Sequence, residues 1–147
     1  MSLSVIFTRA ALGVAAPLVT VEVHISQGLP GLTIVGLPET TVKEARDRVR
    51  SALINSGYSF PARKITINLA PADLPKEGGR YDLPIAIALL AASEQLNATN
   101  LDRYEFVGEL ALTGALRAFL AQYVRQWKHL SQEGRSLFHR IIRVRSG

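Results

Sequence analysis

The sequence predicts an α+β fold in which a β-sheet is covered by helices on one face. Several short segments alternate apolar and polar residues, as half-buried strands do. One longer segment carries apolar residues at helical spacing, and a second helical segment is apolar nearly all round. These segments follow one another in the order β-β-β-α-β-α-β, which indicates one α+β domain.

Five segments are predicted as strands. In the clearest of them, residues 18–25, four β-branched apolar side chains alternate with polar ones, so one face should be buried. The other predicted strands are residues 3–8, 32–35, 64–69 and 105–112. Glycine and proline residues between these segments predict turns.

Two segments are predicted as helices. The first begins at a capping box formed by Thr41 and Glu44, just after Pro38, and ends at Gly57. Its predicted buried face carries Val42, Ala45, Val49, Ala52 and Leu53. The second, residues 82–95, should be the most buried element because it is apolar nearly all round, and Asp82 is expected to cap it.

Three runs carry a family resemblance: residues 31–40, 65–82 and 106–117. The most informative run contains the loop from Pro71 to Pro84, which reads Pro-Ala-Asp-Leu-Pro-Lys-Glu-Gly-Gly-Arg-Tyr-Asp-Leu-Pro. Residues 1–117 resemble the N-terminal domain of the Mg-chelatase-like AAA+ ATPases of the ComM/YifB type. The resemblance implies the ribosomal-S5 domain-2-like fold, which the C-terminal domain of Lon proteases shares.

The resemblance implies a non-catalytic accessory domain of an ATP-driven motor. Full-length members look like hexameric ATPases, and those of the ComM type act on branched DNA in recombination and transformation, whereas the related chelatase subunits drive metal insertion into porphyrins. The implied partners are the AAA+ module, neighbouring subunits and DNA. ATP and Mg²⁺ are expected only in the full-length proteins, because Gly78-Gly79 lacks the following lysine and hydroxyl of a phosphate-binding loop.

A serine peptidase of the Lon type is a remote alternative. The corresponding Lon loop reads Pro-Lys-Asp-Gly-Pro-Ser-Ala-Gly, and residues 75–78 resemble its first half. The nucleophile position then falls on Arg80 or Tyr81, and no lysine lies between Gly114 and Arg117. Because that mechanism needs both the serine and the lysine, we expect no enzymatic activity from this chain.

The net charge of +5 is concentrated in residues 118–147. This tail holds six of the 17 basic residues and one of the 12 acidic residues, which leaves 11 of each sign in residues 1–117. A basic tail that also contains Tyr123, Trp127 and Phe138 has the composition of a nucleic-acid-binding segment. Nucleic-acid binding through basic residues is therefore the alternative function.

The tail has a second interpretation, because the family resemblance ends at Arg117. The family pattern continues Gly-Val-Pro-Gly-Ala-Ile, whereas this chain continues Ala-Phe-Leu-Ala-Gln-Tyr. Codons for the family pattern that are read one base late encode Ala-Phe-Leu-Ala-Gln, and residues 133–138 are compatible with the same shift. We therefore favour a frameshift as the origin of residues 118–147.

The candidate functional patch within residues 1–117 consists of Lys76, Arg80, Arg46 and Arg50. The hypothesis is that these side chains contact DNA or the motor domain of a neighbouring subunit. The alternative is a solvated face whose charges pair with Glu44 and neighbouring acids.

Other chemistries find less support. Asp73, Glu77 and Asp82 suggest an acid/base pair or a Mg²⁺ site, but solvated loop charges and a helix cap explain them more simply. His24 has no second ligand at metal-binding spacing, and the absence of cysteine excludes disulfides. With no signal-peptide pattern and a longest apolar run of residues 83–92, we expect a cytoplasmic protein outside the membrane.

Overall fold

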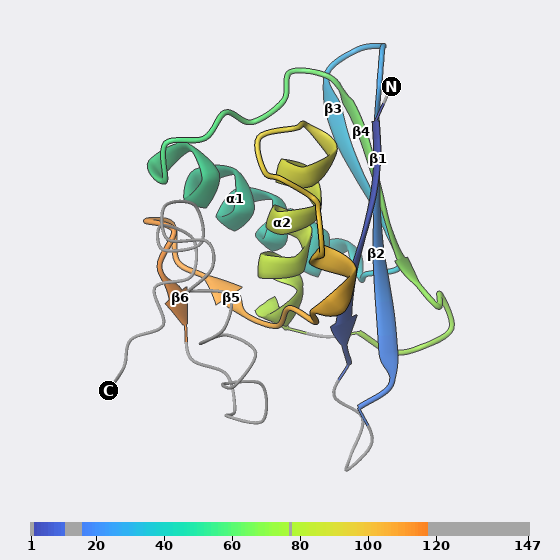
Figure 1. Ribbon diagram of the computed structural model, residues 1–147. Helices are drawn as coiled ribbons and strands as arrows, with labels where there is room; N and C mark the ends of the chain where they lie inside the picture. Colours follow the sequence, from blue (N-terminus) through green and yellow to red (C-terminus); the bar gives the residue numbers. More distant parts are fainter. Residues whose placement is uncertain (1, 11–15, 77, 118–147) are drawn as a thin grey trace.

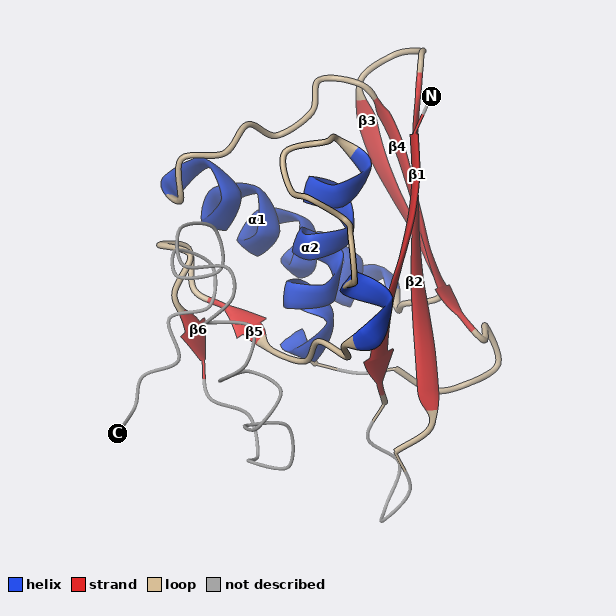
Figure 2. Cartoon of the chain, in the orientation of Figure 1, coloured by secondary structure: helices blue, strands red, loops and turns tan. Residues whose placement is uncertain are grey.

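The computed structural model describes residues 2–10, 16–76 and 78–117. The chain forms, in order, β1 (Ser2–Arg9), β2 (Leu18–Ser26), β3 (Gly31–Val35), α1 (Glu39–Asn55), β4 (Lys64–Ala70), the 3₁₀ turn η1 (Gly79–Tyr81), α2 (Asp82–Ala92), the 3₁₀ turn η2 (Leu101–Arg103), β5 (Glu109–Leu110) and β6 (Leu116–Arg117). The α+β class is therefore confirmed, and Figures 1 and 2 show both helices on the same side of the main sheet.

The main sheet has the strand order β1-β2-β4-β3. β2 pairs antiparallel with β1 and with β4, whereas β3 runs parallel to β4 because α1 carries the chain back between them. The predicted alternation in β2 is confirmed, since Val19, Val21, Val23 and Ile25 are buried and the residues between them are partly exposed. This face of the sheet meets the helices.

The core lies between the sheet and α2. Ten of the eleven residues of α2 are buried, which confirms that it is the most enclosed element. It packs on β1 and β2, and α1 packs against it from the other side. The helix ends at Ala92, three residues before the predicted end.

The start of α1 differs from the prediction. The helix begins at Glu39, its N-cap is Pro38, and no side chain caps it, so the predicted capping box of Thr41 and Glu44 is wrong. Pro38 has φ −57° and ψ 146°, which places its carbonyl to accept the Val42 N–H at 2.9 Å. A proline therefore takes the N-cap position, and Thr41 lies inside the first turn. The predicted end is confirmed, because Gly57 follows the helix with φ +89°.

The last predicted strand, residues 105–112, is interrupted. Glu105 forms one isolated bridge with Phe7 of β1, and only Glu109–Leu110 continues as β5, which pairs with β6 outside the main sheet. Between them the chain turns towards η1 and α2, where Gly108 donates to the Arg80 carbonyl and accepts from the Leu83 N–H at 2.9 and 3.0 Å. These contacts replace the hydrogen bonds that a fifth strand of the main sheet would make.

The other face of the main sheet carries no helix of the described chain (Figure 2). It mixes polar side chains with exposed apolar ones, and Leu3 and Val5 of β1 are 69% and 41% exposed. Within the described ranges, neither helix combines the length and the apolar character that a bilayer crossing demands.

Candidate functional site

The loop between β4 and α2 is held in place by a buried lysine. Lys76 is only 3% exposed, and its Nζ donates to the carbonyls of Pro71, Leu74 and Gly36 at 2.6, 3.0 and 3.2 Å. An ammonium group has three N–H donors, so these carbonyls satisfy it completely. Burial lowers the pKa of Lys76 below its ordinary value. Lys76 thus ties the loop to the turn that follows β3.

That turn depends on a glycine. Gly36 has φ +97°, and a Cβ at this position would collide with the carbonyl oxygen of Leu69 in β4. Only glycine combines this backbone conformation with such a close approach to the neighbouring strand. The carbonyl that Lys76 contacts is therefore placed by the close packing of the turn on β4.

A buried ion pair lies at the other end of the loop. Asp82 is fully buried, and its carboxylate accepts from Arg48 Nε at 2.6 Å, from Arg48 Nη2 at 3.3 Å and from the Leu110 N–H at 3.1 Å. Burial raises the pKa of Asp82 to about 6, while the hydrogen bonds from Arg48 oppose that rise. These contacts join α1, α2 and β5, which is a structural role. The predicted helix cap is wrong, because Tyr81 is the N-cap of α2.

The glycine pair of the loop permits close packing. Gly78 has φ +77°, and a Cβ on Gly79 would lie 2.7 Å from Cγ of Glu109. The pair therefore lets η1 approach β5. It does not open a cradle for phosphate, since a side-chain carboxylate lies directly against it.

The predicted basic patch is not one exposed surface. Lys76 is buried, so the prediction that it contributes to a DNA or subunit contact is corrected: all three of its donors face main-chain carbonyls. Arg46 and Arg80 are half-buried, whereas Arg50 is exposed with its guanidinium 5.8 Å from the centroid of the Phe60 ring. Arg46 and Arg50 are on α1, against which η1 packs with Arg80. Of the predicted patch, three arginines on the adjoining elements α1 and η1 therefore remain as candidates for a contact.

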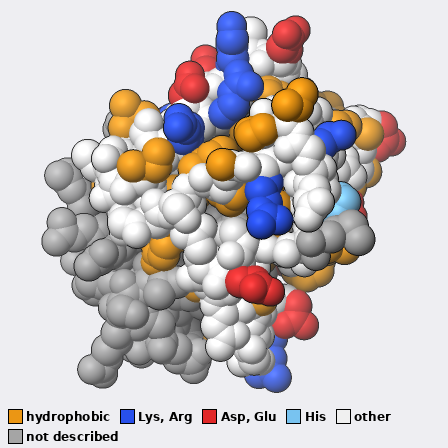
Figure 3. Space-filling model, turned by 90° about the horizontal axis from the view of Figure 1, so that it is seen from above, with side chains coloured by type: hydrophobic (Ala, Val, Ile, Leu, Met, Phe, Trp, Pro, Cys, Tyr) orange, Lys and Arg blue, Asp and Glu red, His pale blue; other side chains and the backbone are white. Residues whose placement is uncertain are grey.

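Charges of both signs are interspersed on the face seen in Figure 3. Basic side chains there lie among acidic and hydrophobic ones, and no continuous basic area is visible. Basic residues of the tail, which dominate the net charge, lie outside the described residues.

The remaining candidates have simple placements. Asp73 is exposed in the loop, His24 lies on the outer face of β2, and Glu77 falls outside the described residues. Tyr81, one of two residues at the position of the Lon nucleophile, is 1% exposed, and burial raises the pKa of its hydroxyl. The part of the chain that the structure describes brings no three metal-binding side chains together.

Sequence reasoning missed Arg48, which is not among the candidate residues that the sequence pattern singled out but pairs with Asp82 in the structure. The available signal was Asp82, because an acid at the head of an apolar helix needs a cationic partner once it is buried. The pattern along the first helix cannot identify that partner, since Arg46, Arg48 and Arg50 all stand on its polar side.

Comparison with known proteins identifies the family to which this chain is similar. A family model described as subunit ChlI of Mg-chelatase matches residues 21–136. The uncharacterized protein YifB of Escherichia coli (strain K12) is 86% identical over 117 residues, which are 80% of this chain and 23% of that relative. With the same coverage, competence protein ComM of Haemophilus influenzae is 68% identical and an uncharacterized protein of Mycobacterium tuberculosis is 41% identical.

The chain spans 23% of the length of these curated relatives. Activities of the longer proteins are therefore a separate question from the family of this chain. The family model covers well over half of the chain, including the loop with Lys76 and Asp82. The chain belongs to the family of the ChlI subunit of Mg-chelatase.

Proposed function

We propose that this chain is a non-catalytic accessory domain of a Mg-chelatase-like AAA+ ATPase of the ComM/YifB type. The single observation that carries the proposal is the internal use of the charged groups at the loop. Lys76 donates all of its hydrogen bonds to main-chain carbonyls, and Asp82 accepts hydrogen bonds from Arg48 and Leu110. Both side chains therefore connect secondary-structure elements of the domain. The ribosomal-S5 domain-2-like fold belongs to this proposal, as does a cytoplasmic location beside the motor.

The proposed role is mechanical coupling. The hairpin of β5 and β6 is attached to the end of α1, where Asn55 Nδ2 donates to the Leu112 carbonyl at 2.7 Å. The packing is tight there, because a Cβ on Gly114 would collide with Ser56 Oγ. A motor module that follows this hairpin would transmit its movements to α1, and through Arg48 and Asp82 to α2. ATP, Mg²⁺ and the branched-DNA substrate belong to that module and its hexamer in this proposal.

A domain exchange tests the proposal. Residues 1–117 of this chain replace the corresponding residues of the Escherichia coli relative, and a second form lacks the domain. The exchange should retain ATP hydrolysis stimulated by branched DNA, whereas the deletion should uncouple hydrolysis from action on the DNA. Equal coupling in the deleted form would rule out an accessory role.

The isolated chain supplies the complementary test. It should show neither ATP hydrolysis nor cleavage of an unfolded protein substrate. Cleavage that survives repeated purification and is lost on Tyr81→Phe would instead support the peptidase alternative.

A further inference from the structure

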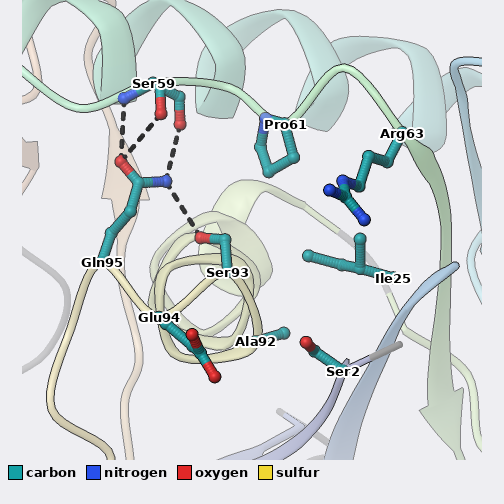
Figure 4. Close-up of a pocket in the computed structure, with 9 residues that line it drawn as sticks. All are labelled: Ser2, Ile25, Ser59, Pro61, Arg63, Ala92, Ser93, Glu94 and Gln95. Atoms are coloured by element: carbon teal, nitrogen blue, oxygen red, sulfur yellow. Dashed lines mark hydrogen bonds between the residues drawn. The ribbon is translucent and has the colours of Figure 1, made fainter.

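A pocket of about 310 Å³ opens at one end of the molecule, away from the loop with Lys76. It lies where β1 begins, β2 ends, the α1–β4 connection passes and α2 ends, and it is lined by Ser2, Ile25, Arg63, Ala92 and Glu94, among others (Figure 4). Its volume is at the lower end of the range of small-molecule sites. The pocket therefore suits a small ligand.

Glu94 occupies an unfavourable position at the rim of this pocket. The Glu94 N–H donates to the Ala91 carbonyl and the Gln95 N–H to the Leu90 carbonyl, at 3.2 and 2.9 Å, which is the pattern of a Schellman motif. Glu94 stands at its left-handed position with φ +60°, where glycine is usual. Its negative charge also lies at the negative end of the dipole of α2.

No interaction in the described chain offsets the left-handed backbone of Glu94 or the unfavourable position of its negative charge at the end of α2. No described residue donates a hydrogen bond to the Glu94 carboxylate or forms an ion pair with it, and the side chain is exposed. Residues that break a local structural rule without a structural gain are characteristic of functional sites. Within the part of the chain that the structure describes, the Glu94 carboxylate is therefore available to a cationic group at the pocket.

Arg63 provides the opposite charge. Figure 4 shows its guanidinium reaching into the pocket near Ile25, with Glu94 on the opposite side and Ala92 and Ser2 between them. The two charged groups do not pair with each other, and the described residues supply Arg63 with no carboxylate. The pocket thus has a positive side and a negative side, each with donors or acceptors to spare.

The wall beside them is fixed. The Gln95 amide accepts from the Ser59 N–H and Oγ at 2.9 and 3.1 Å and donates to the Ser59 carbonyl and Ser93 Oγ, both at 2.9 Å. All four bonding positions of this amide are occupied, so it orders the wall and leaves recognition to Arg63 and Glu94.

We propose that this pocket binds a small zwitterion of the amino-acid or dipeptide type. The carboxylate of the ligand pairs with the Arg63 fork, and its ammonium group lies at Glu94 and the C-terminal carbonyls of α2. A simple anion is repelled by Glu94, and a simple cation is repelled by Arg63. A ligand that carries both charges satisfies both sides, and this gives selectivity for zwitterions.

The test is a titration of the ¹⁵N-labelled full chain, followed by NMR, with glycylglycine, acetate and ethylamine as separate probes. A purification tag is placed at the C-terminus because Ser2 lines the pocket. Glycylglycine should shift the amide signals of Ser93, Glu94 and Gln95 and the Arg63 Nε signal saturably in the millimolar range. Acetate and ethylamine should each bind about tenfold or more weakly.

Charge variants locate the site. Arg63→Gln and Glu94→Gln should each weaken glycylglycine binding about tenfold, whereas Arg103→Gln and Glu39→Gln, which remove exposed charges elsewhere, should leave it unchanged. Circular dichroism verifies that each variant is folded. Acetate binding as tight as glycylglycine binding, with no effect of Glu94→Gln, would overturn the zwitterion assignment. Shifts that never saturate with any probe would overturn the site itself.

Discussion

Lys76 and Asp82 are buried ionic side chains that hold the two ends of one loop. Lys76 contacts only neutral carbonyls, so its charge is solvated by main-chain dipoles. Asp82 instead has a guanidinium partner that is itself partly exposed, with 20% of the Arg48 side chain accessible. The first arrangement orders a turn, and the second joins three secondary-structure elements.

Replacement of Lys76 by methionine should destabilise the chain. Lys76→Met leaves three carbonyls without a donor in a buried position, and we expect a loss of about 2–4 kcal/mol in the free energy of unfolding. Lys64→Met is the matched control, because Lys64 is exposed and the change should stay within about 0.5 kcal/mol. Urea unfolding measures both, and equal stability of the two variants would contradict the role given to Lys76.

Asp82 should make the stability depend on pH. Its pKa in the folded chain is about 6, compared with an ordinary value of 3.8, so the folded state binds the proton more readily. The stabilisation that the folded state gains because Asp82 binds its proton more readily is fully present below the ordinary pKa of 3.8. It is lost as the pH rises through 6. Between about pH 4 and pH 7 the loss amounts to roughly 3 kcal/mol.

Asp82→Asn removes the titrating group. The stability of the original chain relative to this variant should therefore be greater at acidic than at neutral pH, as measured by urea unfolding across the range. Carbon NMR of the side chain gives the pKa directly. Parallel stability curves for the two proteins, or an ordinary carboxyl pKa in the NMR titration, would show that burial does not perturb Asp82 in this way.

At the scale of the elements, glycines and helix ends decide the path of the chain. β3 begins at Gly31 and is followed by Gly36, but the two glycines differ. Gly31 has space for a Cβ, with its nearest contact at 4.0 Å, whereas Gly36 combines a left-handed φ with contact to β4. Of these two glycines, the turn after β3 depends on Gly36 and not on Gly31.

Gly36→Ala should therefore cost at least about 2 kcal/mol in the free energy of unfolding. Gly31→Ala is the control, and its effect should remain within about 0.5 kcal/mol because the methyl group meets open space. Thermal unfolding of both variants checks the difference. Similar midpoints would mean that the turn relaxes without disturbing the loop that Lys76 holds.

At the C-terminus of α2, a substitution is expected to raise the free energy of unfolding, unlike Gly36→Ala. Glu94→Gly should stabilise the chain by roughly 1 kcal/mol, because glycine adopts the left-handed conformation without strain. Asn100→Gly is the comparison, since Asn100 also has a left-handed backbone, with φ +69°, but asparagine tolerates it. A smaller gain is therefore expected there, and urea unfolding of the two variants compares them. A loss of stability in Glu94→Gly would show that the carboxylate has a structural partner.

At the scale of the whole molecule, charge is distributed unevenly along the chain. Residues 1–117 carry equal numbers of basic and acidic residues, and residues 118–147 carry the net charge of +5. The frameshift interpretation of this tail and the DNA-binding alternative both remain predictions. The coding sequence after the Arg117 codon distinguishes the origins, because a shifted frame should continue to a Gly-Lys-Ser/Thr phosphate-binding loop.

Charge alone predicts weak, salt-sensitive binding of the full chain to duplex DNA. Replacement of Arg140, Arg143 and Arg145 by glutamine should weaken binding and lower the salt slope by about 0.9 for each phosphate that is no longer neutralised. The same replacement at Arg46, Arg50 and Arg80 should have a smaller effect, because two of these side chains are half-buried. Fluorescence anisotropy with a labelled duplex measures both. A larger effect of the second triple would locate the DNA-binding surface on α1 and η1.

The sequence by itself determined the α+β class, both helices and the four strands of the main sheet. Local alternation and helical spacing report directly which face of an element is buried, and glycine marks the end of α1 because few other residues adopt its conformation there. The family resemblance was also contained in the sequence, because it rests on residue identities in the loop and its flanking strands.

Only the tertiary structure decided the rest. Lys76 was predicted as a surface charge because nothing local shows that carbonyls from three separate positions surround it. Arg48 could not be distinguished from its neighbours until α2 placed Asp82 against it. The last predicted strand was interrupted by hydrogen bonds to η1 and α2. Arg63 and Glu94, which are 31 positions apart in the sequence, line the same pocket. Each of these features depends on contacts between distant segments, which have no signature in local pattern.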